Sequence, residues 1–145
     1  MAQSIVVIDY GMGNLRSVSK AIEHVAGERD QVHITDDPNR IAGADRIVFP
    51  GQGAARDCMR AIGQHHLNQA VRQAVAEKPF LGICMGLQVL LDHSEENGGT
   101  ELLGLVPGQV RRFPATSLKV PHMGWNCVEP SVDHPLWQGI PAGER

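Results

Sequence analysis

The sequence lacks the features that mark proteins acting on nucleic acids or membranes. No run of Lys or Arg exceeds the pair Arg111 and Arg112, and the formal net charge is −3, so a basic footprint is missing. The opening residues MAQSIVVIDY carry no basic segment before an apolar one, and no stretch approaches the length that spans a bilayer. We therefore predict a cytoplasmic protein whose partners are a small molecule or another protein, with no nucleic acid and no membrane.

Cysteine is also scarce, and no cofactor fingerprint is complete. The three cysteines, Cys58, Cys84 and Cys127, are odd in number and lack C-x-x-C or Cys/His ligand spacing, which argues against a disulfide framework and a zinc site. The segment 10-YGMGNLRS-17 has Arg16 where a dinucleotide-binding loop needs its third glycine. We predict no metal and no cofactor, so a functional cysteine would act as a thiol.

The length of 145 residues and the 42% hydrophobic content fit one domain. Short β-branched runs alternate with helical patterns, which predicts an α/β fold with a doubly wound, mostly parallel sheet and helices on both faces. After residue 97, short alternating runs predict antiparallel strands added to this sheet, and 134–139 predict a helical turn. The predicted elements are strands at 4–9, 31–35, 46–49, 80–83, 105–113 and 124–130, and helices at 15–26, capped by Asn14, and at 54–61, 67–76 and 85–93.

The segment 82-GICMG-86 has the spacing of a nucleophile elbow, with cysteine at the nucleophile position between a buried strand and a helix. Gly82 and Gly86 would give the room that this sharp turn needs, and the helix N-terminus would favour a thiolate at Cys84. The backbone N–H of Met85 would then be one donor of an oxyanion hole. The alternative is a small, inert core cysteine.

A second glycine-containing loop, 49-FPGQGA-54, follows the strand predicted at 46–49. Gly51 and Gly53 would let backbone N–H groups point at a ligand on the same edge of the sheet as Cys84. The loop could give the second oxyanion donor or hold a carboxylate. It could equally be an ordinary strand-to-helix turn.

A cysteine nucleophile needs a histidine base, and no histidine of this chain is a convincing one. His93 lies nine residues along the helix predicted to start at the elbow, which puts it roughly 13 Å from Cys84. His122 is in a Gly/Pro loop beside an aromatic residue, and we favour a loop-ordering role for it. The others fall on predicted helix surfaces, a strand or a solvated loop: His24, His33, His65, His66 and His134.

Four segments together resemble a known family in order over nearly the whole chain. They resemble the glutaminase subunit of imidazole glycerol phosphate synthase, a class I, triad-type glutamine amidotransferase. The elbow and the P-G-x-G loop are common to the wider class, whereas the YGMGN opening and PHMGWN narrow the resemblance to this subunit. The segments are 9-DYGMGNLRSV-18, 49-FPGQGA-54, 80-FLGICMGLQVL-90 and 119-KVPHMGWN-126.

The resemblance implies a flavodoxin-like fold and a set of residue roles. Cys84 would attack the side-chain amide of L-glutamine, form a glutamyl thioester and release ammonia. The N–H of Met85 and an N–H at Gly51 to Gln52 would form the oxyanion hole. The substrate-binding residues implied are Gln88, for the amino-acid end, and Glu96, for the ammonium group.

The resemblance also implies a protein partner, a (β/α)8-barrel cyclase that receives the ammonia and makes imidazole glycerol phosphate. The residues expected to face it are Tyr10, Gly11, Met12 and Asn14, together with Trp125. A half-buried strand aromatic is an equal alternative for Trp125.

In this family the catalytic histidine and its acidic partner lie in a His-x-Glu segment beyond the position of Arg145. We therefore expect residues 1–145 to be a single amidotransferase domain without its C-terminal portion, with little glutaminase activity by itself. One alternative is a catalytically silent docking domain that regulates the barrel partner. Another is a cysteine hydrolase or redox sensor of similar topology, which leaves Gln88 and PHMGWN unexplained.

Overall fold

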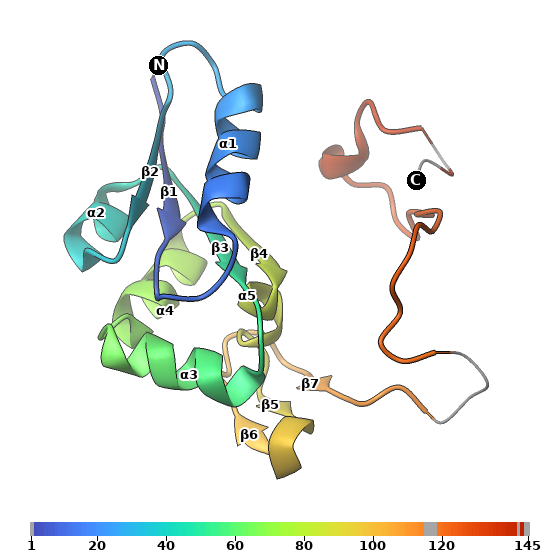
Figure 1. Cartoon of the computed structure of the whole chain (residues 1–145). Coiled ribbons are helices and arrows are strands. Elements are labelled where there is room, and N and C mark those ends of the chain that lie inside the picture. The colour runs from blue at the N-terminus through green and yellow to red at the C-terminus, as the bar shows by residue number, and fades with distance from the viewer. Residues whose placement is uncertain (1, 115–118, 142, 144–145) are drawn as a thin grey trace. The chain divides into compact units, whose positions relative to one another are not determined.

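The structure is a computed structural model that describes residues 2–114, 119–141 and 143. It comprises two compact units, Met1–Arg112 and Phe113–Arg145, which we describe separately. The first unit holds the main sheet and its helices, and the second is largely irregular (Figure 1).

The main sheet has four parallel strands in the order β2-β1-β3-β4. Its strands are β1 (Ser4–Ile8), β2 (Gln31–Thr35), β3 (Arg46–Gly51) and β4 (Phe80–Cys84). β1 and β3 are the central strands and bury most of their residues, as near-continuous apolar runs do in parallel sheets. The predicted parallel α/β sheet is therefore confirmed.

Helices cover both faces of the sheet, as the sequence predicted (Figure 1). Side chains alternate along β1, so Val6 and Ile8 pack into the larger core while Ile5 and Val7 pack into a smaller one. α1 (Leu15–Val25) covers the smaller core. The larger core is covered by α2 (Pro38–Gly43), α3 (Ala55–Gln64) and α4 (Asn68–Glu77).

Side-chain caps fix where two of the helices begin. The Asn14 side chain accepts a hydrogen bond from the Ser17 N–H (3.3 Å), which confirms the predicted cap of α1. α2 is absent from the elements predicted above. Its signal was present, because Asp37 accepts from the Asn39 N–H (2.9 Å) and Pro38 occupies the first helical turn.

The helix after the elbow is much shorter than predicted. α5 (Met85–Gln88) has four residues, and the chain reaches β5 (His93–Ser94) where the sequence predicted continued helix. The carbonyls of residues 89–91 accept hydrogen bonds from N–H groups of residues 103–106 at 2.8–2.9 Å. These tertiary bonds replace the intrahelical ones, and a periodicity confined to residues 85–93 could not reveal them.

A second, smaller sheet has the order β6-β5-β7 and is mixed, not antiparallel as predicted. β6 (Thr100–Glu101) pairs antiparallel with β5, whereas β7 (Gln109–Val110) pairs parallel with it. The strand expected over 105–113 is thus only two residues long. A 3-10 helix, η1 (Glu96–Gly98), connects β5 to β6.

The second unit contains one short element in its described part, the 3-10 helix η2 (Pro135–Trp137). It confirms the helical turn predicted at 134–139. The described residues 124–130 form no strand, so that prediction is wrong. Several large apolar side chains of this unit are exposed, including Phe113, Met123 and Trp125. Within this unit they are not covered by a core.

Candidate active site

Cys84 ends β4 and directly precedes α5, in the strained backbone of a nucleophile elbow. Its φ of +54° and ψ of −117° lie in a region that side-chain-bearing residues rarely adopt. Cys84 is exposed, whereas the two residues after it, Met85 and Gly86, are buried. The turn therefore presents the thiol to solvent, which a packed core cysteine would not do.

Both glycines of the elbow are required by close backbone contacts. A Cβ atom at Gly86 would lie 1.7 Å from the carbonyl oxygen of Phe49, at the end of β3. A Cβ atom at Gly82 would lie 2.8 Å from the Gly86 carbonyl oxygen and from the Leu87 Cα. The predicted reason for the glycine spacing is confirmed in geometry, because α5 packs against two strands with no space for side chains.

The sequence predicted a buried strand before Cys84, but β4 is only partly buried. β4 is at an edge of the four-stranded sheet, and Leu81, Ile83 and Leu87 are exposed. Continuous apolar runs predict burial on both faces, but an edge strand has a neighbour on one side only. Cys84 thus stands at the carboxyl end of the edge strand of this four-stranded sheet.

The P-G-Q-G loop (residues 50–53) lies beside Cys84, as predicted for the two ends of parallel strands. Gly51 is buried and pairs with Cys84 in the β3–β4 register. Gln52 is exposed, and Gly53 has a φ of +90°. The elbow (residues 82–86) and the P-G-Q-G loop are therefore adjacent on the same edge of the sheet.

Side-chain hydrogen bonds hold the P-G-Q-G loop and the helix that follows it. The buried Cys58 thiol donates to the Gln52 carbonyl (3.4 Å). The Glu96 carboxylate accepts from the Ala55 N–H (2.9 Å) at the start of α3. The resemblance implies that Glu96 binds the substrate ammonium, and the structure shows that it also caps this helix.

Met85 and Gln88 occupy the two ends of α5. Met85 is the first helical residue, so its N–H has no carbonyl partner within the helix. Gln88 is half-buried and lies one turn after Cys84, so both residues belong to the same face of the chain. The single turn of α5 has a much smaller dipole than the longer helix predicted, which weakens the argument from helix charge.

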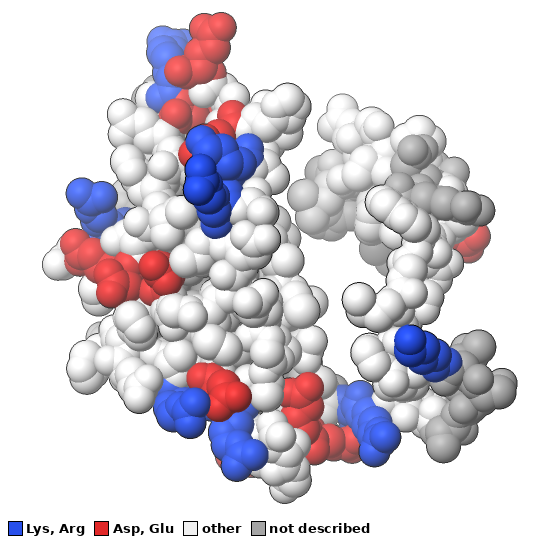
Figure 2. Space-filling view, in the orientation of Figure 1, with Lys and Arg blue, Asp and Glu red and all other residues white. Residues whose placement is uncertain are grey.

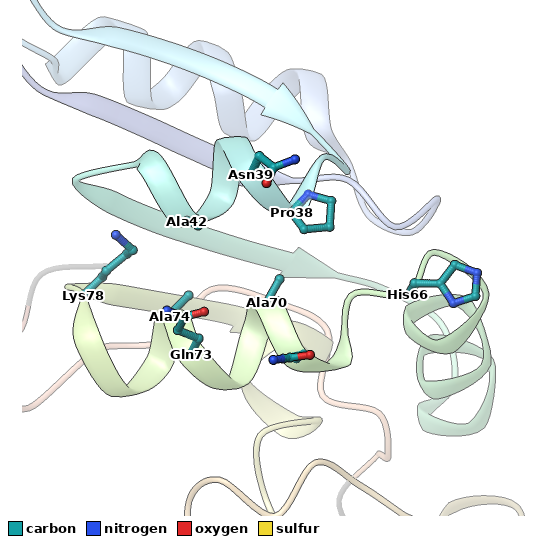
Figure 3. A pocket seen from close by; sticks show the side chains of 9 residues that line it. Pro38, Asn39, Ala42, His66, Ala70, Gln73, Ala74 and Lys78 are labelled. Carbon is teal, nitrogen blue, oxygen red and sulfur yellow. The ribbon is translucent and has the colours of Figure 1, made fainter.

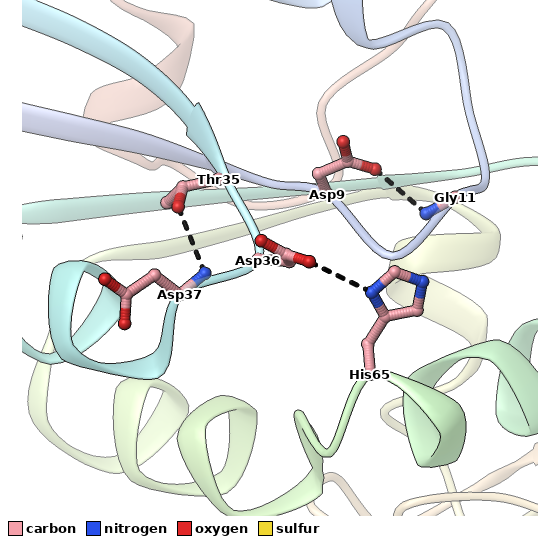
Figure 4. A network of polar contacts seen from close by, with 6 residues as sticks. All are labelled: Asp9, Gly11, Thr35, Asp36, Asp37 and His65. Carbon is pink, nitrogen blue, oxygen red and sulfur yellow. Dashed lines mark hydrogen bonds and ion pairs between the residues drawn. The ribbon is translucent and has the colours of Figure 1, made fainter.

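Among the described residues, no histidine hydrogen-bonds to Cys84. His65 pairs with Asp36 (3.2 Å), as Figure 4 shows. His33 forms a hydrogen bond with the Gln31 side chain, and the His134 ring accepts one from the Leu136 N–H. His93 is in β5, so its predicted place on a helix was wrong, and with it the reason given for excluding it.

The N-terminal loop contacts the P-G-Q-G loop. Tyr10 is fully buried, so its side chain is not on the surface as the partner-facing prediction required. A Cβ atom at Gly13 would lie 3.4 Å from the Gly51 nitrogen, and one at Gly53 would lie 3.2 Å from the Met12 Cε. Tight packing against residues 49–53 explains why Tyr10 points inward.

The other residues predicted to face a partner remain accessible in part. Gly11 and Asn14 are exposed, and Met12 is half-buried. The Gly11 N–H donates to the Asp9 carboxylate (2.9 Å), a turn drawn in Figure 4. Trp125 is 85% exposed and His122 is exposed, and both belong to the second unit.

A pocket on the first unit is separate from these residues (Figure 3). It lies between α2 and α4 and contains none of the predicted site residues. The side chains that line it are Pro38, Asn39, Ala42, His66, Gln69, Ala70, Gln73, Ala74 and Lys78. The Lys78 ammonium donates to the Ala44 carbonyl (2.8 Å) and is therefore already used.

Charges on the face drawn in Figure 2 are mixed, with Lys and Arg interspersed among Asp and Glu. Within the described part of the chain, no helix is long and apolar enough to cross a membrane. The same residues contain no group of three or more His, Cys, Asp or Glu arranged to hold a metal ion.

Comparison with known proteins identifies relatives along nearly the whole chain. Residues 6–141 match the family model of class-I glutamine amidotransferases. The chain is 59% identical over 153 residues to "Imidazole glycerol phosphate synthase subunit HisH" of Thiobacillus denitrificans, covering 100% of this chain and 66% of the relative. It is 56% identical over 147 residues to the protein of the same name from Methylococcus capsulatus, covering 96% and 67%. The chain spans about two thirds of the length of these curated relatives.

Solved structures agree on the fold. One described as a glutamine amidotransferase superposes with a TM-score of 0.58 at 20% identity, covering 74% of this chain and 56% of that one. Another, described as a putative peptidase E protein from Listeria monocytogenes, gives a TM-score of 0.55 at 12% identity, covering 72% and 63%.

Proposed function

The chain belongs to the class I glutamine amidotransferase family, and within it to the HisH subunits of imidazole glycerol phosphate synthase; on this premise we propose that it uses Cys84 to release ammonia from L-glutamine. The observation that carries the proposal is the elbow. Cys84 is exposed at a strained turn, and Gly82 and Gly86 are both confined by backbone contacts.

In the proposed reaction the Cys84 sulfur, as the thiolate, attacks the amide carbon of the glutamine side chain. The C–S bond forms, the carbonyl π electrons move to oxygen, and the resulting oxyanion is held by backbone N–H groups. Collapse breaks the C–N bond, the leaving nitrogen takes a proton, and ammonia departs from a glutamyl thioester. Water then attacks the thioester, which gives glutamate and restores the thiol.

The oxyanion donors that we propose are the N–H of Met85 and an N–H of the P-G-Q-G loop at Gly51 to Gln52. Support comes from the position of Met85 at the start of α5 and from the pairing of Gly51 with Cys84. Each such donor typically contributes about 10²–10³ in rate.

We propose Gln88 as a contact for the amino-acid end of the substrate, because it follows Cys84 by one helical turn. Glu96 uses its Oε2 atom on the Ala55 N–H, which leaves Oε1 for a substrate ammonium group. Glu96 would then have two roles, capping α3 and binding the substrate.

Ammonia would pass to a cyclase subunit with a (β/α)8-barrel fold, in a complex that makes imidazole glycerol phosphate for histidine biosynthesis. The accessible candidates for this interface are Gly11, Met12 and Asn14 in the first unit and Trp125 in the second. A cytoplasmic location stays a prediction from the sequence.

Turnover also needs a general base, and no described histidine hydrogen-bonds to Cys84. We expect the 145-residue chain by itself to show little steady-state glutaminase activity, because a thioester without a base is hydrolysed slowly. The same observation favours the second candidate function, a silent docking domain for the barrel partner. That candidate predicts no effect of glutamine on the reactivity of Cys84.

Substrate protection tests the proposed function without requiring turnover. L-Glutamine should slow the alkylation of Cys84 by iodoacetamide, while L-asparagine, which is one methylene shorter, should not. Gln88→Ala should weaken the protection without changing the unprotected rate. Equal rates of Cys84 alkylation with and without saturating glutamine would exclude glutamine binding at the elbow and favour the silent domain.

A further inference from the structure

Cys58 is a buried thiol that the reaction above does not use. It belongs to α3, is fully buried, and donates a hydrogen bond to the carbonyl of Gln52 (3.4 Å). Most buried free cysteines act as small apolar side chains. This one instead bonds to the middle of the loop that is proposed to hold the oxyanion.

The buried Tyr10 hydroxyl is a second polar group under the same loop. Tyr10 is 0% exposed, and its oxygen lies near the Cys58 thiol without a hydrogen bond of ordinary geometry to any described residue. Buried tyrosine hydroxyls usually have a partner. A Cβ atom at Gly51 would lie 2.3 Å from this oxygen, so the hydroxyl is in contact with the Gly51 backbone. The Tyr10 ring is supported by Phe49, at 5.0 Å between ring centroids.

The protonation state of Cys58 suits a donor. Burial raises the pKa of the Cys58 thiol, so the sulfur keeps its proton at neutral pH. Burial likewise raises the pKa of the Tyr10 phenol, with the nearby Cys58 adding to the shift. Both groups therefore present neutral, protonated side chains to the underside of the loop.

A restraint beyond the end of β3 has a purpose, because the chain leaves the sheet ladder after Gly51. Gly51 and Gly53 flank Gln52, and glycines permit backbone conformations that other residues do not. A planar trans peptide points its carbonyl and its N–H in opposite directions. If the Gln52 carbonyl is held toward Cys58, the Gly53 N–H in the same peptide plane must point away from α3. The Gln52 N–H is then separated from that fixed plane only by the φ and ψ torsions of Gln52.

We propose that Cys58 is a positioning residue: its hydrogen bond to the Gln52 carbonyl fixes the peptide plane between Gln52 and Gly53, and so limits the orientation of the Gln52 N–H, while the buried Tyr10 side chain packs against Gly51. The proposal rests on the proposed function, because it assigns a purpose to the loop only if an oxyanion forms beside Cys84. It predicts that loss of the Cys58 donor impairs steps that form an oxyanion and spares steps that do not.

Two electrophiles separate these kinds of step at Cys84. A chloromethyl ketone with a glutamine-like side chain is attacked by the Cys84 sulfur at its carbonyl carbon, which gives a thiohemiketal oxyanion. The sulfur then displaces chloride at the methylene carbon, while the first C–S bond breaks and the C=O bond re-forms. Iodoacetamide reacts by direct displacement of iodide, with no oxyanion. The measurement is the second-order rate constant for the chloromethyl ketone divided by that for iodoacetamide, both at Cys84. Each is determined by peptide mass spectrometry on the 145-residue chain.

In Cys58→Val, which keeps an apolar side chain of similar size but has no donor, the ratio should fall about tenfold, part of the 10²–10³ that one oxyanion donor supplies. Cys58→Ser, which keeps a donor, should restore most of the ratio. Cys127→Ser removes an exposed thiol of the second unit and should leave the ratio at its original value.

The outcomes distinguish this proposal from the proposed function. If the ratio at Cys84 of the original chain were no higher than the ratio at the exposed Cys127, the proposed function itself would be contradicted. An original chain with the preference, and a Cys58→Val chain with the same ratio, would overturn the role of Cys58. Equal losses of both rates in Cys58→Val would also overturn it, because they would indicate general damage at the elbow.

Discussion

At the residue scale, two glycines decide what the elbow tolerates, because a Cβ atom at Gly82 or Gly86 would lie within 3 Å of backbone atoms. The G-x-C-x-G spacing predicted a strand-to-helix turn with room only for glycine, and the contacts of Gly82 and Gly86 confirm it. The Cys58 bond to the Gln52 carbonyl could not be predicted, because a cysteine in an amphipathic helix has the same pattern whether or not its thiol is bonded. Tyr10 was placed on the surface because a loop motif does not show which of its side chains points inward.

The close contact at Gly86 makes a stability prediction. Gly86→Ala puts a methyl group against the Phe49 carbonyl, at a Cβ-to-oxygen distance of 1.7 Å before relaxation. The free energy of unfolding should fall by about 3 kcal/mol or more, as measured by urea denaturation. Gly63→Ala is the matched control, because Gly63 is inside α3 with nothing within 4 Å of the added Cβ. It should stabilise the chain by about 0.5–1 kcal/mol, and similar losses in both variants would contradict this account.

The positive φ of Cys84 makes a second prediction. A residue with a Cβ atom is strained at φ +54°, whereas glycine is not. Cys84→Gly should therefore be about 1 kcal/mol more stable than Cys84→Ala, as measured by thermal denaturation of both chains. If the alanine variant were the more stable, the elbow would have an ordinary backbone and would not be strained.

At the element scale, the sequence predicted the strands and helices of the parallel sheet, but not how long the helix after the elbow continues. Apolar periodicity sufficed for β1, β3 and the flanking helices because their partners follow from a regular alternation. It failed after Gln88, where residues 89–91 bond to residues 103–106. It failed again at β7, whose two residues pair parallel with β5 after a return of the chain that no local pattern encodes.

The cap of α1 can be separated from a contact with a partner. Asn14→Ala removes the hydrogen bond to the Ser17 N–H and should cost about 1 kcal/mol of unfolding free energy. Asn14→Ser keeps a capping oxygen and should cost little. If Asn14 also contacts the cyclase, the serine variant should bind it more weakly at unchanged stability, as measured by calorimetry. Equal affinity of Asn14→Ser and the original chain would leave Asn14 with the cap alone.

Asp30, just before β2, accepts a hydrogen bond from the residue just before β1, and its titration should change the melting temperature at acid pH. Asp30 accepts hydrogen bonds from the N–H groups of Gln3 (2.8 Å) and Gly27 (3.0 Å), which lower its pKa. Its contribution to stability is present above the ordinary carboxyl value of about 4 and is lost as the pH falls through the lower folded value. Asp30→Asn should flatten the fall in melting temperature below pH 4, and an unchanged slope would contradict the assignment.

At the scale of the whole molecule, family membership rests on more than the elbow. The match to the class I model covers residues 6–141 of this chain, and the two relatives described above are 59% and 56% identical to it over 153 and 147 residues. The fold places Cys84 and the P-G-Q-G loop on one edge of the sheet. The structure confirms the predicted adjacency of the two loops and adds the restraints around them, whereas the roles of their residues stay predictions.

The central claim is that Cys84 is a nucleophile prepared for the amide of glutamine, and site-resolved labelling tests it most directly. The chain would be treated with a limiting amount of a glutamine-analogue electrophile, and the modified cysteine would be identified by peptide mass spectrometry. Cys84 and Cys127 are both exposed and Cys58 is buried, so accessibility alone predicts comparable labelling of the first two. We predict that Cys84 is labelled first and that free L-glutamine prevents it; earlier or equal labelling of Cys127 would contradict the account.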